Sequence, residues 1–129
     1  MSDSDELLSA LYHALRAPRR RKVIRLLQES DSTVTKTREL ARKITALERG
    51  LPERRATGEP YRNAYNALSQ THLPTLARAG IVIYDPQRQT VSRGHNYALA
   101  SLLLRIDKPT VDTFSSLTES DEDPDRNHR

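Results

Sequence analysis

Amide and arginine side chains gather between residues 61 and 70. Arg62, Asn63, Asn66, Ser69 and Gln70 are spaced so that, on a helix, they lie largely opposite the apolar side formed by nearby leucines. Arginine pairs well with guanine, and asparagine or glutamine with adenine. We therefore interpret this helix face as one that contacts base edges in a major groove. The alternative is an ordinary polar face that contacts only solvent.

Candidate contacts to a phosphate backbone occur at three further places. They are Lys36, Thr37 and Arg38 at the start of a predicted helix, Arg54 and Arg55 in a loop, and Arg88, Gln89 and Arg93 in a predicted β-hairpin. Two cations at a helix N-terminus oppose the helix dipole, an arrangement that a bound phosphate would neutralise. The loop pair Arg54 and Arg55 has the alternative role of a solvated linker.

The densest run of positive charge is Arg19-Arg20-Arg21-Lys22. It coincides with a predicted helix N-terminus, where positive charge is unfavourable. Two explanations stay open at this stage. The run contacts a nucleic-acid backbone, or it pairs with acidic residues elsewhere, including those at the C-terminus.

The charge of the chain is divided into three segments. The 129 residues have a net charge of +4, but residues 1–15 carry −3, residues 16–110 carry +11 and residues 111–129 carry −4. A basic middle of this size favours an anionic partner, and nucleic acid is the specific partner that we expect. The alternative is a solvated basic face.

Several classes of chemistry are not supported by the residues. The chain has no Cys, and its four His residues (His13, His72, His95 and His128) show no metal-ligand spacing. No phosphate-binding loop, dinucleotide fingerprint or catalytic triad is found. We therefore expect no enzyme activity, no metal, no cofactor and no evident small-molecule ligand. No apolar run approaches the length of a membrane span, so we expect a cytoplasmic protein with no membrane partner.

Apolar spacing predicts the elements that must position these residues. Helices are expected near residues 7–15, 18–29, 35–50, 60–79 and 95–109, and strands at Val34, 81–84 and 90–92. Thr35 is the expected N-cap of the third helix, and Gly50 and Gly80 are expected helix stops. Pro74 should bend the fourth helix because it removes the bond to the carbonyl of Gln70. Leu68, Leu73, Leu76 and Ala77 are expected to face the core, and Tyr65 is expected to pack.

The order helix, helix, strand, helix, helix, hairpin, helix is typical of a winged helix-turn-helix. The segments 14–27, 38–41 (Arg-Glu-Leu-Ala) and 71–82 (Thr-His-Leu-Pro-Thr-Leu-Ala-Arg-Ala-Gly-Ile-Val) resemble those of prokaryotic winged-helix regulators. The last segment, with a long loop before it, is similar to a small winged-helix family of halophilic archaea. The resemblance covers about residues 7–93. It implies a mainly α fold with a small β-hairpin wing and an additional C-terminal helix.

We divide the chain accordingly into three parts. Residues 5–94 form the expected DNA-binding domain, residues 95–109 a dimerisation helix, and residues 110–129 an acidic tail expected to be disordered. The terminal helices carry more apolar surface than a small wing could cover. The expected dimer contacts are Leu8, Leu11, Leu99, Leu102, Leu103 and Ile106.

The sequence therefore predicts a homodimeric, sequence-specific regulator of transcription that binds double-stranded DNA. Its recognition helix would enter the major groove and its wing would contact the adjacent backbone or minor groove. Repression is the simpler mode, since occupying a promoter needs no further partner. Two alternatives stay open: a winged-helix module for protein interaction, and a non-specific, chromatin-like DNA binder. A further hypothesis is that the acidic tail competes with DNA for the basic middle.

Overall fold

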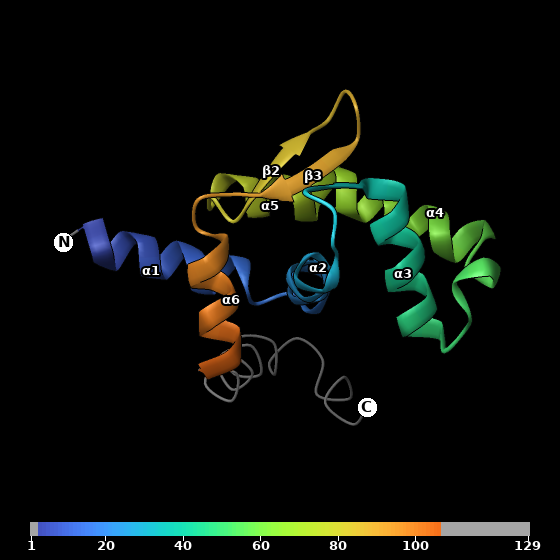
Figure 1. The fold of residues 1–129 in the computed structure, drawn as a ribbon, viewed down its shortest axis with the longest axis horizontal. Helices are drawn as coiled ribbons and strands as arrows, with labels where there is room; N and C mark the ends of the chain where they lie inside the picture. Colours follow the sequence, from blue (N-terminus) through green and yellow to red (C-terminus); the bar gives the residue numbers. More distant parts are fainter. Residues whose placement is uncertain (1–2, 107–129) are drawn as a thin grey trace, which may run out of the picture.

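The fold is mainly helical with a small antiparallel sheet, as expected (Figure 1). The computed structural model describes residues 3–106. The elements are α1 (Asp3–Ala14), α2 (Pro18–Glu29), β1 (Val34–Lys36), α3 (Thr37–Arg49), the 3-10 turn η1 (Glu53–Arg55), α4 (Gly58–Ala67), the π-helical turn η2 (Leu68–His72), α5 (Leu73–Arg78), β2 (Val82–Asp85), β3 (Thr90–Arg93) and α6 (Tyr97–Ile106). The predicted tail lies outside the described residues.

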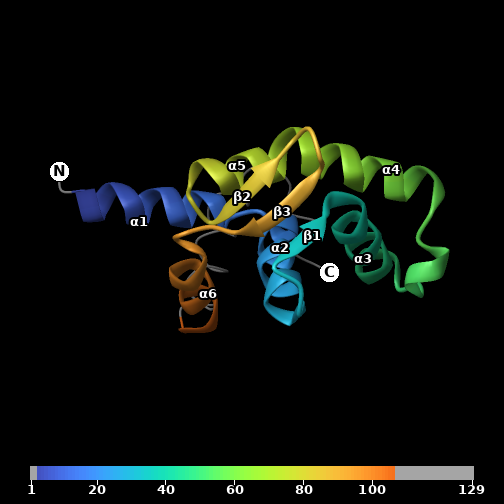
Figure 2. The same ribbon diagram turned by 45° about the horizontal axis from the view of Figure 1, so that its top comes forward.

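The three strands form one antiparallel sheet in the order β1-β3-β2. Thr35 of β1 and Val91 of β3 are cross-strand partners, and both side chains are buried. The neighbouring row, which contains Val34 and Ile83, is exposed because strand side chains alternate between the two faces. One face of the hairpin therefore packs on the helices, while its turn extends beyond them (Figures 1 and 2).

The hydrophobic core is built from one side of every helix and from the inner face of the sheet. Leu68, Leu73 and Leu76 are fully buried, and Ala77 packs against this core, as the sequence predicts. Leu11 of α1 and Leu15, which follows α1, are also fully buried. The long helical segment containing α4 and α5 is thus fixed to the domain along its apolar side.

Helix α3 begins two residues later than the sequence indicates. Thr35, the expected N-cap, is a strand residue, and Lys36 takes the cap position without a side-chain cap. The backbone N–H of Thr37 instead donates to the carbonyl of Gln89 in the wing (2.9 Å). The helix ends as predicted at Gly50, whose φ of 65° is the left-handed conformation that glycine favours.

The predicted fourth helix consists of three consecutive helical pieces that run from Gly58 to Arg78. The expected disturbance at Pro74 takes the form of the π turn η2, immediately before it. The N–H of Leu73 donates to the carbonyl of Leu68, five residues earlier. A proline has no N–H, and a π turn is one way for a helix to accommodate that loss. The helix stop at Gly80 is confirmed by its φ of 74°.

Helix α6 packs on α2 at the end of the described chain. The Tyr97 hydroxyl donates to the carbonyl of Ile24 (2.7 Å), and Ala100 and Leu104 are buried. Among residues 3–106, no helix has both the length and the apolar character needed to span a membrane.

Candidate nucleic-acid interface

The polar face of α4, which continues through Gln70 in η2, is exposed to solvent. Arg62, Asn63, Asn66 and Gln70 are exposed, whereas Ala64 and Leu68 on the opposite side are fully buried. Ser69 is half-buried, and its hydroxyl donates to the carbonyl of Asn66 (3.3 Å). The expected exposure of the arginine and amide side chains is therefore observed, while Ser69 is already bonded to its own helix.

Two tyrosines flank this face on the side of α3. Tyr61 and Tyr65 have ring centroids 6.2 Å apart, and both pack partly against the core. Burial raises the pKa of Tyr65, and the nearby Arg38 has a smaller, opposing effect. Tyr65 is thus a packing residue, as expected.

The start of α3 supplies two of the three expected contacts. Lys36 and Arg38 are exposed. Thr37 is fully buried, and its hydroxyl has no hydrogen-bond partner. The prediction that the Thr37 side chain contacts phosphate is therefore wrong, because the chain turns at this residue from β1 into α3 and directs that side chain inward.

The wing turn presents a single exposed cation. Arg88 has an 84% exposed side chain, and its guanidinium lies 4.0 Å from the carboxylate of Asp85. The other Asp85 oxygen accepts hydrogen bonds from the backbone N–H groups of Gln87 and Arg88. Asp85 thereby fixes the turn that holds Arg88 outward.

Gln89 is a structural residue of the wing, which corrects the expected DNA contact. Its side-chain oxygen accepts a hydrogen bond from Tyr84 (3.0 Å), and its side-chain nitrogen donates to the carbonyl of Pro86 (3.0 Å). Its φ of 53° is left-handed, an uncommon conformation for a residue other than glycine. The side chain is therefore bonded within the turn instead of extending from it.

Tyr84 links the wing to η2, the turn that continues α4, and the sequence alone does not predict this role. Its hydroxyl lies 3.0 Å from the side chain of Gln89 and 3.4 Å from the carbonyl of Ser69. Gln89 in turn accepts the N–H of Thr37 through its backbone carbonyl. Tyr84 and Gln89 thus connect the wing to η2, the continuation of α4, and to the start of α3. In the sequence, this connection is indicated only by the turn-forming residues after β2 and by the tyrosine within that strand.

Arg93 lies at the far end of β3 from the wing turn, where it is exposed, and its expected contact with DNA stays a prediction. Its guanidinium donates to the carbonyl of Leu27 at the end of α2 and lies over the ring of Tyr97, 4.9 Å from the centroid. Both contacts are favourable for an arginine. Arg93 therefore joins β3, α2 and α6. Arg54 and Arg55 remain exposed in η1.

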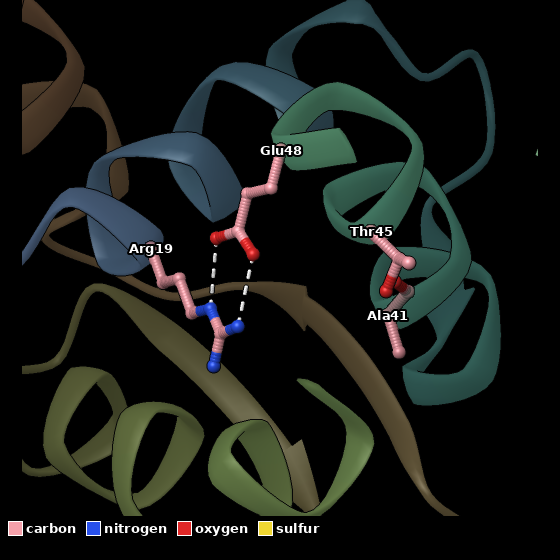
Figure 3. Close-up of polar contacts among 4 residues, drawn as sticks. All are labelled: Arg19, Ala41, Thr45 and Glu48. Atoms are coloured by element: carbon pink, nitrogen blue, oxygen red, sulfur yellow. Dashed lines mark hydrogen bonds and ion pairs between the residues drawn. The ribbon is translucent and has the colours of Figure 1, made fainter. Parts of the chain in front are cut away.

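The basic run at the start of α2 is held by the protein itself. Arg19 makes a two-point contact with Glu48 of α3, at 2.8 and 2.9 Å (Figure 3). Arg20 is buried and donates to the carbonyl of Ala14 (2.6 Å), and Arg21 donates to those of Leu15 and Arg16. Figure 3 also shows the buried Thr45, whose hydroxyl donates to the Ala41 carbonyl (2.8 Å). Of the two earlier explanations, pairing with an acidic residue applies to Arg19, while Arg20 and Arg21 pair with carbonyls left open at the end of α1.

The expected dimer contacts fall into two groups. Leu8, Leu99, Leu102 and Ile106 are exposed, with Ile106 at 65%. Leu11 is fully buried in the core of its own chain and Leu103 packs against that core. Leu11 is thus unavailable to a partner, because α1 turns this side chain toward the core.

Two histidines of the described chain lie in partly enclosed positions, His13 beside a cavity and His72 beside Arg20. Within residues 3–106, no cluster of three or more His, Asp or Glu residues lies close enough together to hold a metal ion. His13 lines a cavity of about 490 Å³ between α1 and α5, and burial lowers its pKa, with Arg16 and Arg20 adding to the effect. His72 is half-buried beside Arg20 and packs as expected.

Comparison with known families now adds one finding. Residues 12–92, well over half of the chain, match the family model described as domain of unknown function DUF7344. The chain belongs to the DUF7344 family. In this member, the match runs from α1 to β3 and so includes α4 and the wing. No match was found among curated proteins or solved structures.

Proposed function

We propose that this DUF7344 protein is a sequence-specific DNA-binding regulator of transcription that acts as a homodimer. The observation that carries the proposal is the exposed side of α4, where Arg62, Asn66 and Gln70 extend from a helix whose other side is fixed in the core. A helix of this kind fits the major groove, and its arginine and amide side chains reach base edges there.

Cations from the neighbouring elements supply phosphate contacts in this proposal. Lys36 and Arg38 at the start of α3 and Arg88 in the wing turn are exposed on elements that Tyr84 and Gln89 join to α4. Phosphate contacts give affinity and fix register, whereas base contacts give sequence preference. By occupying a promoter in the cytoplasm, the protein would act as a repressor without a further partner.

A binding titration tests this proposal. The full-length protein selects a preferred duplex from a random library, and its affinity for that duplex and for a scrambled one is measured across salt. We expect log affinity to fall with log salt by about 0.9 per phosphate contact. Arg62→Ala and Asn66→Ala should each cost about 1–3 kcal/mol on the preferred duplex and much less on the scrambled one.

Arg49→Ala is the matched control, since it removes an exposed arginine at the C-terminal end of α3, the opposite end from Lys36 and Arg38, and should leave both affinities unchanged. Equal affinity for the two duplexes, unaltered by the α4 substitutions, would instead support a non-specific binder. Absence of any binding would favour a protein-interaction module that uses the exposed leucines of α6.

A further inference from the structure

A second surface lies on α2 and α3, away from the wing. It is a groove of about 710 Å³ between these two helices and the loop that follows α3. Its apolar residues include Leu26, Leu47 and Leu51. Its charged residues are the cations Lys22, Arg25 and Lys43 and the carboxylates Glu29 and Glu53, so cations are in excess by one. Leu47 is 61% exposed, although it belongs to the apolar stripe of α3. An apolar groove beside cations fits a segment that is both apolar and acidic.

Of the three cations that line this groove, Lys43 forms an ion pair within the described chain. Lys43 lies 3.5 Å from Glu53, an exposed and therefore weak ion pair. Within residues 3–106, neither Lys22 nor Arg25 makes an ion pair or hydrogen bond, in contrast to the three arginines before them in α2. The α2 side of the groove therefore carries two cations outside any ion pair of the described chain, with Glu29 beside them and with Lys22 close enough to Glu48 to help lower the pKa of that carboxyl.

The sequence beyond α6 contains both apolar and acidic residues, which would complement the leucines and cations of the groove. Residues 107–129 have a net charge of −4 and include Phe114, the only phenylalanine in the chain. Val111, Phe114 and Leu117 recur at intervals of three residues. Acidic residues follow them at Glu119, Asp121, Glu122, Asp123 and Asp125. An apolar stretch is thus followed directly by an acidic one.

The end of α6 lies within reach of the groove. Helix α6 packs on α2, and α2 packs on α3. Two such interhelical distances amount to about 16–20 Å. The eight residues 107–114 span up to about 26 Å when extended. The C-terminal ends of α3 and α6 also extend to the same side of the molecule, opposite the wing turn (Figures 1 and 2).

We propose that the chain's own C-terminal segment docks in the α2–α3 groove, with Val111, Phe114 and Leu117 on its leucines and the acidic run beside Lys22 and Arg25. This assignment places the acidic segment on the opposite side from the turn that carries Arg88. It differs from competition with DNA for the basic middle, and it does not depend on DNA binding.

Because the chain has no cysteine, a single Ser115→Cys substitution in the full-length protein gives one site for a nitroxide label. We expect the label to remove most of the NMR intensity of the Leu26, Leu47 and Leu51 methyl groups, and little from those of Leu8, which lies on α1. The same label with Phe114→Ser and Val111→Ser should restore the intensity. Circular dichroism of each variant checks that the domain stays folded.

A mixed sample distinguishes docking of a chain's own C-terminal segment from docking of the segment of a second copy. Nitroxide-labelled protein without isotope is combined with isotope-labelled protein that lacks the nitroxide. Full intensity in the mixture, together with loss in the singly labelled chain, supports docking within one chain. Loss in the mixture would assign the groove to the tail of a second copy and overturn the proposal. Loss of methyl intensity at Ala64 and Ala67 of α4, or no loss of intensity at any methyl group, would overturn the proposal as well.

Discussion

His72 and Arg20 form a contact that depends on the protonation state of the histidine. The Nη1 atom of Arg20 lies 3.4 Å from Nδ1 of His72, which accepts the hydrogen bond only when the ring is neutral at that nitrogen. Burial, together with the neighbouring Arg20, lowers the pKa of His72 from 6.5 to about 4. The folded protein therefore holds His72 in its neutral form at physiological pH.

This shift predicts that acid destabilises the fold through His72. Between pH 6.5 and about 4 the unfolded state binds a proton that the folded state does not bind. The contribution is complete above pH 6.5 and is lost as pH falls toward 4. We expect a loss of about 1–2 kcal/mol in the free energy of unfolding, allowing for solvent screening of a half-buried ring.

Denaturant unfolding at a series of pH values measures this loss. His72→Gln keeps a neutral acceptor and has no titrating ring, so its unfolding free energy should vary less across this window. The difference between the two profiles isolates His72 from the other histidines. Parallel profiles for the two proteins would show that His72 does not titrate as we expect.

The sequence predicts the exposed face of α4 well because apolar periodicity records which side of a helix is buried. It fails at Thr37, whose side chain is buried, and at Gln89, whose side chain is bonded within the wing turn. Residue type alone marks each of these as a possible DNA contact. Whether a side chain extends into solvent or bonds to a nearby carbonyl depends on turns that composition and spacing do not specify.

At the scale of elements, the wing is fixed to the helical segment of α4 and η2 through a few polar atoms. The Tyr84 hydroxyl contacts both Gln89 in the turn and the carbonyl of Ser69, and the Gln89 carbonyl accepts the N–H of Thr37. These bonds set the position of Arg88 relative to α4. The orientation of the wing therefore depends on one tyrosine as well as on the apolar packing of the hairpin.

Tyr84→Phe should loosen this connection without emptying the space that the ring fills. Loss of one hydroxyl hydrogen-bonded to two groups should reduce the free energy of unfolding by about 0.5–1.5 kcal/mol. The amide of Thr37 should also exchange faster with solvent. Unfolding and hydrogen exchange measure the two effects. Tyr61→Phe removes a hydroxyl that has no partner among the described residues, so it serves as the matched control. Equal effects of the two substitutions would argue against a linking role for Tyr84.

Element types followed from the sequence more closely than element boundaries did. Gly50 and Gly80 end their helices as predicted because a left-handed residue stops a helix locally. The start of α3 and the π turn before Pro74 depend on tertiary contacts. Thr35 is drawn into the sheet opposite Val91, and the long helix must keep Leu68 and Leu73 on the core despite the proline.

At the scale of the whole molecule, the polar helix face and the exposed leucines occupy different ends. The first turns of α1 lie at one end of the longest axis and α4 lies toward the other (Figure 1). Leu8 of α1, together with Leu99, Leu102 and Ile106 of α6, is exposed to solvent. Contact through these helices would leave the α4 face of each copy free. A two-fold dimer of this kind would present two recognition helices to a palindromic site.

Leu102→Asp tests this arrangement, because the side chain is 41% exposed and a carboxylate there should leave the core intact. In sedimentation experiments, we expect the full-length protein to form a dimer. Leu102→Asp should raise the dissociation constant of that dimer at least tenfold, about 1.4 kcal/mol. Ile83→Asp changes an equally apolar, 62% exposed residue on the sheet and should leave the dimer unchanged. On a duplex with two half-sites a whole number of helical turns apart, the α6 variant should lose cooperative binding while it keeps its affinity for a single half-site. A monomeric wild-type protein at micromolar concentration, or equal weakening by the two substitutions, would assign the exposed leucines to another role.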